Sequence, residues 1–296
     1  MTVLVLGATG KTGKPVVDAL VAQGVKVRAA SRNPAAASES VEPVRFDWAD
    51  RGTWAAALSG VDGLYVVGPY AAPDAAELLD ALLAAAPQVE RVVLLSVLGA
   101  DMLPDAVPMQ AWEASVRASG KQWTILRPNW FQQNFGEGAF TATLRDGAQL
   151  RLPAADATVG FVDTRDIAEV AAAALTQDGH TGQIHIITGP ERLSHASAMG
   201  ILGHAAGREL RYTALTADEF AQELHDAGLD DRSITWQLGL FTLIRDGANA
   251  LLTDTVERIT GHPARSLEAY AREHATVWRS TARGGNPEPA LRGVRP

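Results

Sequence analysis

The feature that most constrains this chain is a glycine-rich turn at its N-terminus. The apolar residues 3–6 predict a buried parallel strand, and residues 12–23 predict a helix with its apolar side chains on one face. Between them the sequence reads Gly7-Ala8-Thr9-Gly10-Lys11-Thr12-Gly13, a G-x-x-G-x-x-G pattern. We expect Gly7 to permit the tight turn, Gly10 to let the backbone approach a pyrophosphate, and Gly13 to let the helix lie close to the strand. In this context the pattern predicts a Rossmann-type βαβ unit that binds a dinucleotide.

The turn also contains Gly10-Lys11-Thr12, which could form the end of a P-loop. A P-loop needs a further glycine five residues before Gly10, and that position is Val5. The P-loop is therefore excluded, and the helix after the turn offers its free N–H groups to a pyrophosphate instead. We expect Thr9, Lys11 and Thr12 to bind the cofactor together with the glycines.

The second predicted strand covers residues 25–30. The residues that follow it indicate whether the cofactor is NADP or NAD. An NAD enzyme places Asp or Glu there to bind the ribose hydroxyls, and this sequence has no acid between Asp18 and Glu39. Ser31 and Arg32 stand where a 2′-phosphate would lie. A charge-assisted bond from arginine to phosphate contributes about 1.5–3 kcal/mol. We therefore predict NADP(H) as the cofactor.

The third predicted strand, 44–46, is followed by Asp47 and Trp48, which we also expect to lie near the cofactor. Asp47 could accept a hydrogen bond from the adenine amino group. It could equally cap the helix that begins nearby, because aspartate is a common N-cap residue. The sequence leaves both interpretations open.

Strands alternate with helices over most of the chain, which predicts an α/β fold: a Rossmann doubly wound parallel sheet with helices on both faces. The expected strands are 3–6, 25–30, 44–46, 63–67, 91–95, 123–126 and 183–188. The expected helices are 12–23, 54–58, 75–86, 110–119, 165–176, 194–207, 217–227 and 267–278. Residues 1–128 and 161–190 would form the dinucleotide-binding domain, and residues 129–160 and 191–279 a smaller, mainly helical substrate-capping region. Residues 280–296, rich in Gly, Pro and Arg, are expected to form a disordered tail.

Composition excludes several classes of function. The chain has no cysteine, which excludes disulfides, thiolate catalysis and Cys-ligated zinc. Its net charge is −8 and it has no Lys/Arg cluster, so we expect no nucleic-acid partner. Its seven histidines lack metal-ligand spacing, and there is no G-x-S-x-G elbow. Without a long apolar run or a signal peptide, we expect a cytoplasmic protein with no membrane contact.

Several motifs together resemble the NmrA-like branch of the atypical short-chain dehydrogenases/reductases. The resemblance extends to about residue 278 and includes the glycine-rich turn. It also includes Thr124-Ile125-Leu126-Arg127-Pro128 with Trp130-Phe131 and Asn134, Phe161-Val162-Asp163 with Asp166-Ile167-Ala168, Thr188-Gly189-Pro190, and Thr260-Gly261-His262-Pro263. These motifs are specific to the family but not to one substrate.

The resemblance implies further site residues. Val67, Gly68 and Pro69 should line the cofactor, and Ser96 should face the nicotinamide and the substrate. Tyr70, directly after these lining residues, could reach the substrate or be a plain loop tyrosine. The substrate pocket should lie over the nicotinamide, and its expected lining residues are Met109, Trp112, Trp130, Phe131 and Asn134. The aromatic residues among them favour a large flat substrate, with core packing as the alternative.

The sequence departs from the family of short-chain reductases in its proton donor. These enzymes typically use a Tyr-x-x-x-Lys pair, and no such pair occurs in this chain. If the family's spacing is counted back from Glu113, the positions of the tyrosine and the lysine fall near Asp105 and Met109. We expect Ser96 to orient a carbonyl by a hydrogen bond more than to protonate it, and Tyr70, water or the substrate's own hydroxyl remain possible donors.

Two classes of function remain. The first is an NADPH-dependent ketoreductase or quinone reductase that acts on a bulky aromatic ketone or quinone. A ketone is reduced to an alcohol, whereas a quinone is reduced to a phenol, which has a pKa near 10 and is a much stronger acid than an alcohol. Quinone reduction therefore needs less help from an acid, by roughly 8 kcal/mol. The family that this sequence resembles includes tailoring ketoreductases of aromatic polyketide antibiotic biosynthesis, which implies a substrate of that kind. The second is a redox sensor that binds NADP(H) without turnover and signals to a protein partner. The oligomeric state is not predicted.

Overall fold

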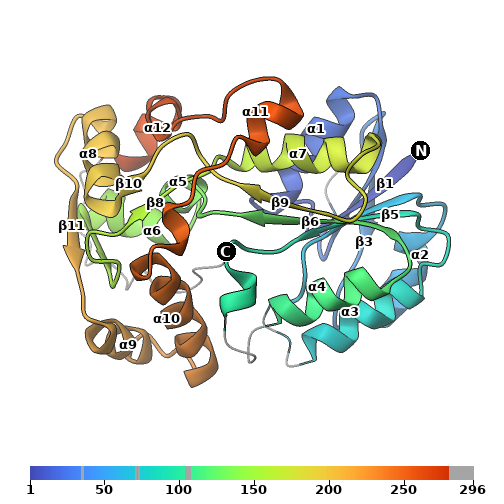
Figure 1. The fold of residues 1–296 in the computed structure, drawn as a ribbon, viewed down its shortest axis with the longest axis horizontal. Helices are drawn as coiled ribbons and strands as arrows, with labels where there is room; N and C mark the ends of the chain where they lie inside the picture. The colour runs from blue at the N-terminus through green and yellow to red at the C-terminus, as the bar shows by residue number, and fades with distance from the viewer. Residues whose placement is uncertain (35–36, 71, 73, 104–107, 280–296) are drawn as a thin grey trace.

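The alternating strands form a seven-stranded parallel sheet in the order β3-β2-β1-β4-β5-β6-β9 (Figure 1). The computed structural model describes residues 1–34, 37–70, 72, 74–103 and 108–279 of the 296-residue chain. The strands are β1 Thr2–Leu6, β2 Lys26–Ser31, β3 Val41–Arg45, β4 Gly63–Val66, β5 Arg91–Leu95, β6 Gln122–Pro128 and β9 Gln183–Ile187. The order reverses between β1 and β4, and in such sheets the crevice at the carboxyl ends of these strands binds the ligand.

Alternate side chains of the central strand β1 enter two separate hydrophobic cores. Leu4 and Leu6 pack with the helices of one face, whereas Val3 and Val5 pack with those of the other, and all four are 0% exposed. The first face is covered by α2 Trp54–Leu58, α3 Ala75–Ala84 and α4 Met109–Ala118, and the second by α1 Gly13–Ala22 and α7 Thr164–Thr176. Burial on both faces explains why this strand is apolar without alternation.

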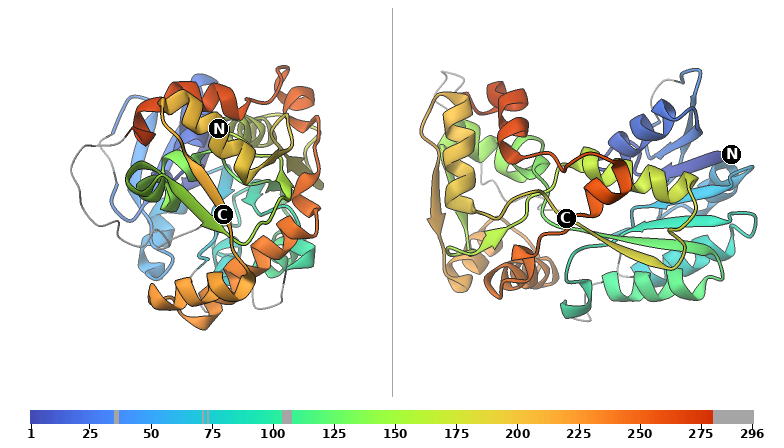
Figure 2. Two further views of the ribbon diagram at one scale, coloured as in Figure 1. Left: turned by 90° about the vertical axis from the view of Figure 1, so that its left-hand side faces the viewer. Right: turned by 45° about the horizontal axis from the view of Figure 1, so that its top comes forward.

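A smaller lobe lies beyond the carboxyl ends of the strands (Figure 2). Its short strands pair β7 with β11 in parallel and β8 with β10 in antiparallel. We call this lobe the cap. Its elements are α5 Gln133–Gly136, α6 Ala139–Ala142, the π-helix Thr143–Gly147, β7 Gln149–Leu152, β8 Thr158–Val159, β10 Leu193–Ser194, α8 His195–Ala206, β11 Arg211–Ala214, α9 Ala217–Asp226, α10 Asp231–Arg245 and α12 Leu267–His274. Single 3₁₀ turns are Arg51–Thr53, Ala100–Met102, Ala248–Ala250 and Ala275–Trp278.

Two of the sequence motifs connect the cap to the sheet domain. Asp163 caps α7 through a bond from the Arg165 N–H to its Oδ1 (2.8 Å), and the same oxygen accepts a bond from Gln133 at the start of α5. Asp166 accepts bonds from the backbone and the guanidinium of Arg265. These acidic side chains are 0% exposed, so the motif residues hold distant segments together.

The predicted fold class is confirmed, and each expected strand and helix has a counterpart within a few residues. The sequence interpretation missed α5, α6, the π-helix, α10, α11 Thr255–Thr260 and the short strands of the cap. The helix expected over 267–278 ends at His274. The division into two domains stays a prediction. The helix α11 lies in the segment assigned to the cap and packs against α7 (Figure 1). The expected tail, 280–296, lies outside the described residues.

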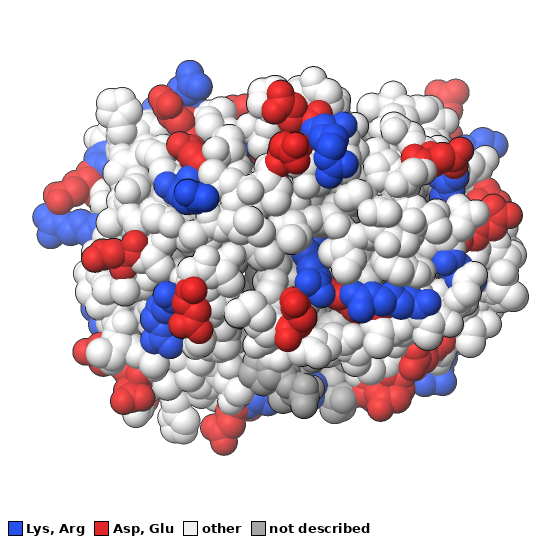
Figure 3. All heavy atoms as spheres, viewed as in Figure 1, with Lys and Arg blue, Asp and Glu red and all other residues white. Residues whose placement is uncertain are grey.

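Surface charge and helix hydropathy can be described for the same part of the chain. On the face drawn in Figure 3, acidic and basic side chains are interspersed over both lobes. Over the described ranges, no helix has the length and apolarity needed to span a bilayer.

Candidate cofactor and substrate site

The glycine-rich turn has a geometry that leaves room for no side chain at its last glycine. Gly7 has a φ of +66°, and its carbonyl accepts a hydrogen bond from the Gly10 N–H at 2.8 Å. A Cβ on Gly13 would lie 2.1 Å from the Gly7 oxygen, whereas a Cβ on Gly10 would lie 3.2 Å from it. Gly13 therefore sets the close packing of α1 on the turn, and Gly10 keeps the backbone open. Thr9 and Gly10 are exposed, so the turn can be approached from solvent.

Lys11 joins the turn to the cap. Its Nζ donates a hydrogen bond to Oδ1 of Asn134 in α5 at 2.7 Å. A Cβ on Gly138 would lie 2.6 Å from the same Nζ, so a glycine there leaves space for the lysine. The structure thus brings together Lys11, predicted to bind the cofactor, and Asn134, predicted to bind the substrate. Thr12, the third polar residue of the turn, is 5% exposed.

The end of β2 carries a buried hydroxyl beside the turn. The Ala8 N–H donates to the Ala30 carbonyl at 3.0 Å, which holds the end of β2 next to the glycines. Ser31 is 9% exposed, and its Oγ has no hydrogen-bond partner among the described residues. The exposed Arg32 follows it. An orphaned hydroxyl and a guanidinium suit a phosphate, so these residues fit an NADP(H) cofactor.

Asp47 and Trp48 contact nearby backbone groups. The sequence alone leaves open whether Asp47 caps the chain locally or contacts adenine. Oδ1 of Asp47 accepts the N–H of Ala49 at 3.1 Å, which is a local turn cap. The indole Nε1 of Trp48 donates to the Val67 carbonyl at 3.3 Å and so reaches the loop after β4. A contact of either residue with adenine stays a prediction.

The loop after β4 lies against the turn on one side and against α4 on the other. A Cβ on Gly7 would be 3.6 Å from Val67, and a Cβ on Gly68 would overlap the Trp112 indole at 2.4 Å. The indole Nε1 donates to the Ala75 carbonyl at 2.9 Å, which fixes the ring. Pro69 follows in the same loop, and its carbonyl accepts the N–H of residue 72.

Tyr70 contributes a protonated hydroxyl to this loop. Its ring meets Trp112 edge-on with centroids 5.0 Å apart. The hydroxyl is buried without a partner among the described residues, and burial raises the pKa of Tyr70 above its usual value of 10. At neutral pH this group therefore stays an O–H donor.

Ser96 is part of a buried ion-pair network that the sequence analysis missed. Its hydroxyl donates to Oε1 of Glu113 at 2.7 Å, and both residues are 2% exposed. The guanidinium of Arg127 binds both Glu113 oxygens at 2.8 Å, and Arg117 adds a bond at 2.8 Å. The single hydroxyl hydrogen of Ser96 is thus used by Glu113, which does not favour the expected donor role towards a carbonyl. The sequence signals no ion pair between Arg127 and Glu113, because the two residues lie on different predicted elements.

The five residues predicted to bind substrate occupy different environments. All are at most 9% exposed: Met109, Trp112, Trp130, Phe131 and Asn134. Phe131 packs into the core beneath α7, so for this residue the packing alternative is the one that the structure shows. Trp130 packs on Phe241 of α10, with centroids 5.1 Å apart, at the boundary between cap and sheet. Asp105 lies outside the described residues.

A cleft of about 1050 Å³ begins at the turn and runs between the outer faces of α1 and α7. Thr9, Gly10 and Lys11 line its inner end, and Arg165 and Arg265 line its side. Both arginines are paired, with Glu273 and Glu169 respectively among their partners. None of the predicted substrate residues lines this cleft, so it is not the expected substrate pocket.

Comparison with known proteins points to a family of nucleotide-dependent oxidoreductases. Residues 7–178 match the family model described as NAD(P)H-binding. The chain is 34% identical over 281 residues to the uncharacterized oxidoreductase YesF of Bacillus subtilis, covering 94% of this chain and 96% of that protein. It is 33% identical over 287 residues to an NAD(P)H azoreductase of Xenophilus azovorans, covering 93% and 99%.

Two solved structures share the fold. The NADPH-dependent quinone oxidoreductase QOR2 of Escherichia coli, in complex with NADPH, matches with a TM-score of 0.79 and 23% identity, covering 92% of this chain and 99% of that chain. NmrA, a negative transcriptional regulator in complex with NADP, matches with a TM-score of 0.71 and 16% identity, covering 92% and 94%. At these identities the likeness concerns the fold alone.

Proposed function

The chain belongs to the NAD(P)H-binding, NmrA-like branch of the atypical short-chain dehydrogenases/reductases, and from this membership we propose that it is an NADPH-dependent reductase of flat aromatic quinones, ketones or azo compounds. The relatives named oxidoreductase and azoreductase support an enzyme over a regulator. The observation that carries the proposal is the open glycine-rich turn with the Ser31 hydroxyl beside it, which lacks a partner within the described part of the chain.

The residues around the turn select the cofactor. When bound, NADPH supplies the hydride that reduces the substrate. The N-terminus of α1 and the open backbone at Gly10 would hold its pyrophosphate, and Lys11 would add a positive charge. Ser31 and Arg32 would bind the 2′-phosphate, since no carboxylate follows β2 to repel it. This arrangement favours NADPH over NADH.

The proton supply is the unusual part of the proposal. Reduction of a quinone adds one hydride and one proton, and the chain lacks the Tyr-x-x-x-Lys pair that would deliver the proton. The Ser96 hydrogen is held by Glu113, so Ser96 would support the site's structure. Tyr70 keeps its proton and would orient the acceptor oxygen. The proton itself would come from water or from a phenol of the substrate, because a phenolate product needs little acid.

A panel of substrates tests the proposal. Loss of NADPH absorbance would be followed with menadione as quinone, methyl red as azo dye and a hydroxylated polycyclic ketone. We expect turnover of the quinone, and Gly10→Val should abolish it by blocking the pyrophosphate while the far-ultraviolet circular dichroism stays unchanged.

The alternative is an NADP(H) sensor without turnover. The missing Tyr–Lys pair and the shared fold with a transcriptional regulator favour it. It would be supported if NADPH binds, no acceptor in the panel oxidises it, and a protein partner co-purifies in a manner that depends on the NADP⁺/NADPH ratio.

A further inference from the structure

The interior of the cap contains a histidine that neither the cofactor site nor the proton supply uses. His195 is the first residue of α8, and its side chain is 0% exposed. Neither Nδ1 nor Nε2 has a hydrogen-bond partner among the described residues. Burial lowers the pKa of His195 to about 4, so the ring is neutral at pH 7 and carries one N–H donor and one acceptor.

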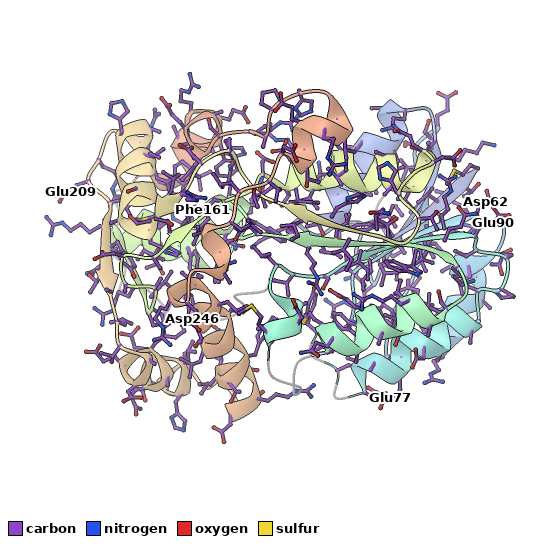
Figure 4. The ribbon with its side chains drawn as sticks, in the orientation of Figure 1. Asp62, Glu77, Glu90, Phe161, Glu209 and Asp246 are labelled. Atoms are coloured by element: carbon purple, nitrogen blue, oxygen red, sulfur yellow. The ribbon has the colours of Figure 1, made fainter. Side chains whose placement is uncertain are left out.

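Three aromatic rings from distant segments surround this imidazole. Tyr212 of β11 stacks on it with centroids 5.6 Å apart and an angle of 26°. Phe161, which precedes α7, meets it edge-on at 5.4 Å and 88°, and Trp130, which follows β6, at 6.4 Å and 86°. Figure 4 shows Phe161 within the cap, on the side nearest the sheet. We call these four residues the aromatic cage.

The aromatic cage borders the boundary between the cap and the carboxyl end of β6. Trp130 contacts both the imidazole and Phe241 of α10. One turn before Phe241, Gln237 is 3% exposed, and its Oε1 likewise lacks a partner among the described residues. Positions four apart share a helix face, so Gln237 lies on the side of α10 that faces Trp130. The segments that meet at the Trp130 indole therefore carry two buried polar groups without partners among the described residues, at the edge where the substrate pocket is expected.

Packing alone gives no reason for these polar groups. A buried donor or acceptor without a partner destabilises the fold, and an apolar residue would fill the same space without that cost. A site that must recognise a polar group on an apolar ligand has this composition: aromatic walls and a few convergent donors and acceptors.

We propose that His195 is a specificity-determining residue of the substrate site, whose N–H donates a hydrogen bond to an acceptor oxygen of a flat, uncharged aromatic substrate. This inference rests on the proposed reductase function. The ligand class is a quinone, because it presents a second carbonyl oxygen opposite the one that is reduced. A neutral imidazole suits this uncharged oxygen, whereas a carboxylate would favour a cationic partner. Trp130, which is 9% exposed and lies at the boundary with the sheet domain, would turn aside as the substrate enters.

Variants at His195 show whether the imidazole serves substrate binding or only the packing of the cap. His195→Leu removes both unpaired nitrogens and should raise Tm, because an apolar side chain then occupies an apolar site. It should also raise KM for menadione about tenfold with a smaller change in kcat, the effect of losing one hydrogen bond. His195→Gln, which keeps a neutral donor and acceptor, should restore KM. His204→Leu, on the exposed side of the same helix, is the control and should leave KM and the Kd of NADPH unchanged.

Two measurements keep the outcome decisive. An unchanged KM in a folded His195→Leu protein would overturn the proposal, and so would an unchanged KM in Gln237→Leu if the first variant does not fold. If the wild-type protein oxidises no NADPH with any acceptor, the proposed function fails separately. Menadione binding by tryptophan quenching then tests His195 alone: we expect binding that weakens about tenfold in His195→Leu, and no binding by the wild type would refute the inference as well.

Discussion

Ser96 and Tyr70 are the two hydroxyl-bearing residues that the sequence predicts near the reaction, and their surroundings give them different properties. Ser96 gives its hydrogen to a carboxylate held by two arginines, whereas the Tyr70 hydroxyl is protonated and has no partner among the described residues. The sequence could place both residues after their strands. It could not show the network, because Ser96, Glu113 and Arg127 meet only when β5, α4 and β6 pack together.

The first prediction is that neither hydroxyl is an essential acid. Tyr70→Phe removes one neutral hydrogen bond and should lower kcat with menadione about three- to tenfold. Ser96→Ala should have an equal or smaller effect on kcat. An essential general acid would cost on the order of a hundredfold or more. A Tyr70→Phe protein that binds NADPH normally but has lost activity completely would show that Tyr70 is the acid.

Cofactor preference is also expected to depend on a single residue, Arg32. Arg32→Ala removes the guanidinium expected at the 2′-phosphate and should erase most of a preference for NADPH over NADH of about tenfold or more, since 1.4 kcal/mol corresponds to one such factor. Calorimetric Kd values for both cofactors check this. Arg51→Ala, an exposed arginine beside Trp54, is a matched control that should leave the ratio unchanged. Equal affinities in the wild-type protein would contradict the prediction.

His195 makes stability depend on pH in a defined direction. Its folded pKa of about 4 lies below the unfolded value of about 6.5, so the unfolded chain binds more protons between these values. Stability from this group is therefore present above pH 6.5 and is lost as the pH falls towards 4. The loss from pH 7 to pH 5 should be about 2 kcal/mol. Tyr212, stacked on the ring, stays protonated throughout because burial raises its pKa.

Urea unfolding at the two pH values measures this effect. The wild-type free energy of unfolding contains contributions from every titrating group, so the informative quantity is the difference from His195→Leu. From pH 7 to pH 5, the free energy of unfolding of the wild type should fall by about 2 kcal/mol more than that of His195→Leu. A difference that does not change with pH would mean that the imidazole is readily protonated in the folded protein.

At the scale of elements, the strands of the sheet were the most predictable. Their apolar runs are fixed by burial on two faces, and glycines mark their ends. The cap was not predictable in the same way, because β7 pairs with β11 across about sixty residues and each is only four residues long. The helix α10 was missed, since its polar and apolar residues follow contacts with α9 and the 3₁₀ turn at Ala248–Ala250.

The turn between β1 and α1 contains two glycines whose substitution should affect Tm and NADPH affinity differently. Gly13→Ala places a Cβ 2.1 Å from a backbone oxygen, so the turn must move and Tm should fall by several degrees or more. Gly10→Ala meets the same backbone oxygen at 3.2 Å and should lower Tm less than Gly13→Ala does, but NADPH affinity should drop at least tenfold. Gly200→Ala in α8 has open space and is the control for a glycine-to-alanine change. Equal Tm losses at positions 10 and 13 would contradict this account of the turn.

On the scale of the whole molecule, two lobes meet around the expected cofactor. The cap is held to the sheet domain by buried side chains of α5, by the α7 acids and by the segment that contains Arg265. The family motifs could be recognised in the sequence because the hydrogen bonds between cap and sheet domain require particular polar side chains. The contents of the aromatic cage were not, because its four rings come from positions 130 to 212 and are brought together only by the cap's own fold.

The bond between Lys11 and Asn134 predicts a link between cofactor binding and the cap. The lysine lies on the turn that would receive the pyrophosphate, and it donates to a neutral amide of α5. A doubly charged pyrophosphate attracts the ammonium group more strongly, so NADPH binding should withdraw Lys11 from Asn134. Asn134→Leu removes the competing acceptor and should therefore tighten NADPH binding, by up to about tenfold for a bond of 1.4 kcal/mol. In a Lys11→Met background the same substitution should have no effect on affinity, which is the double-mutant test of the link. Hydrogen exchange of residues 133–136 should become faster in the wild-type protein when NADPH is added. Slower exchange together with weaker binding in Asn134→Leu would show instead that Asn134 itself holds the cofactor.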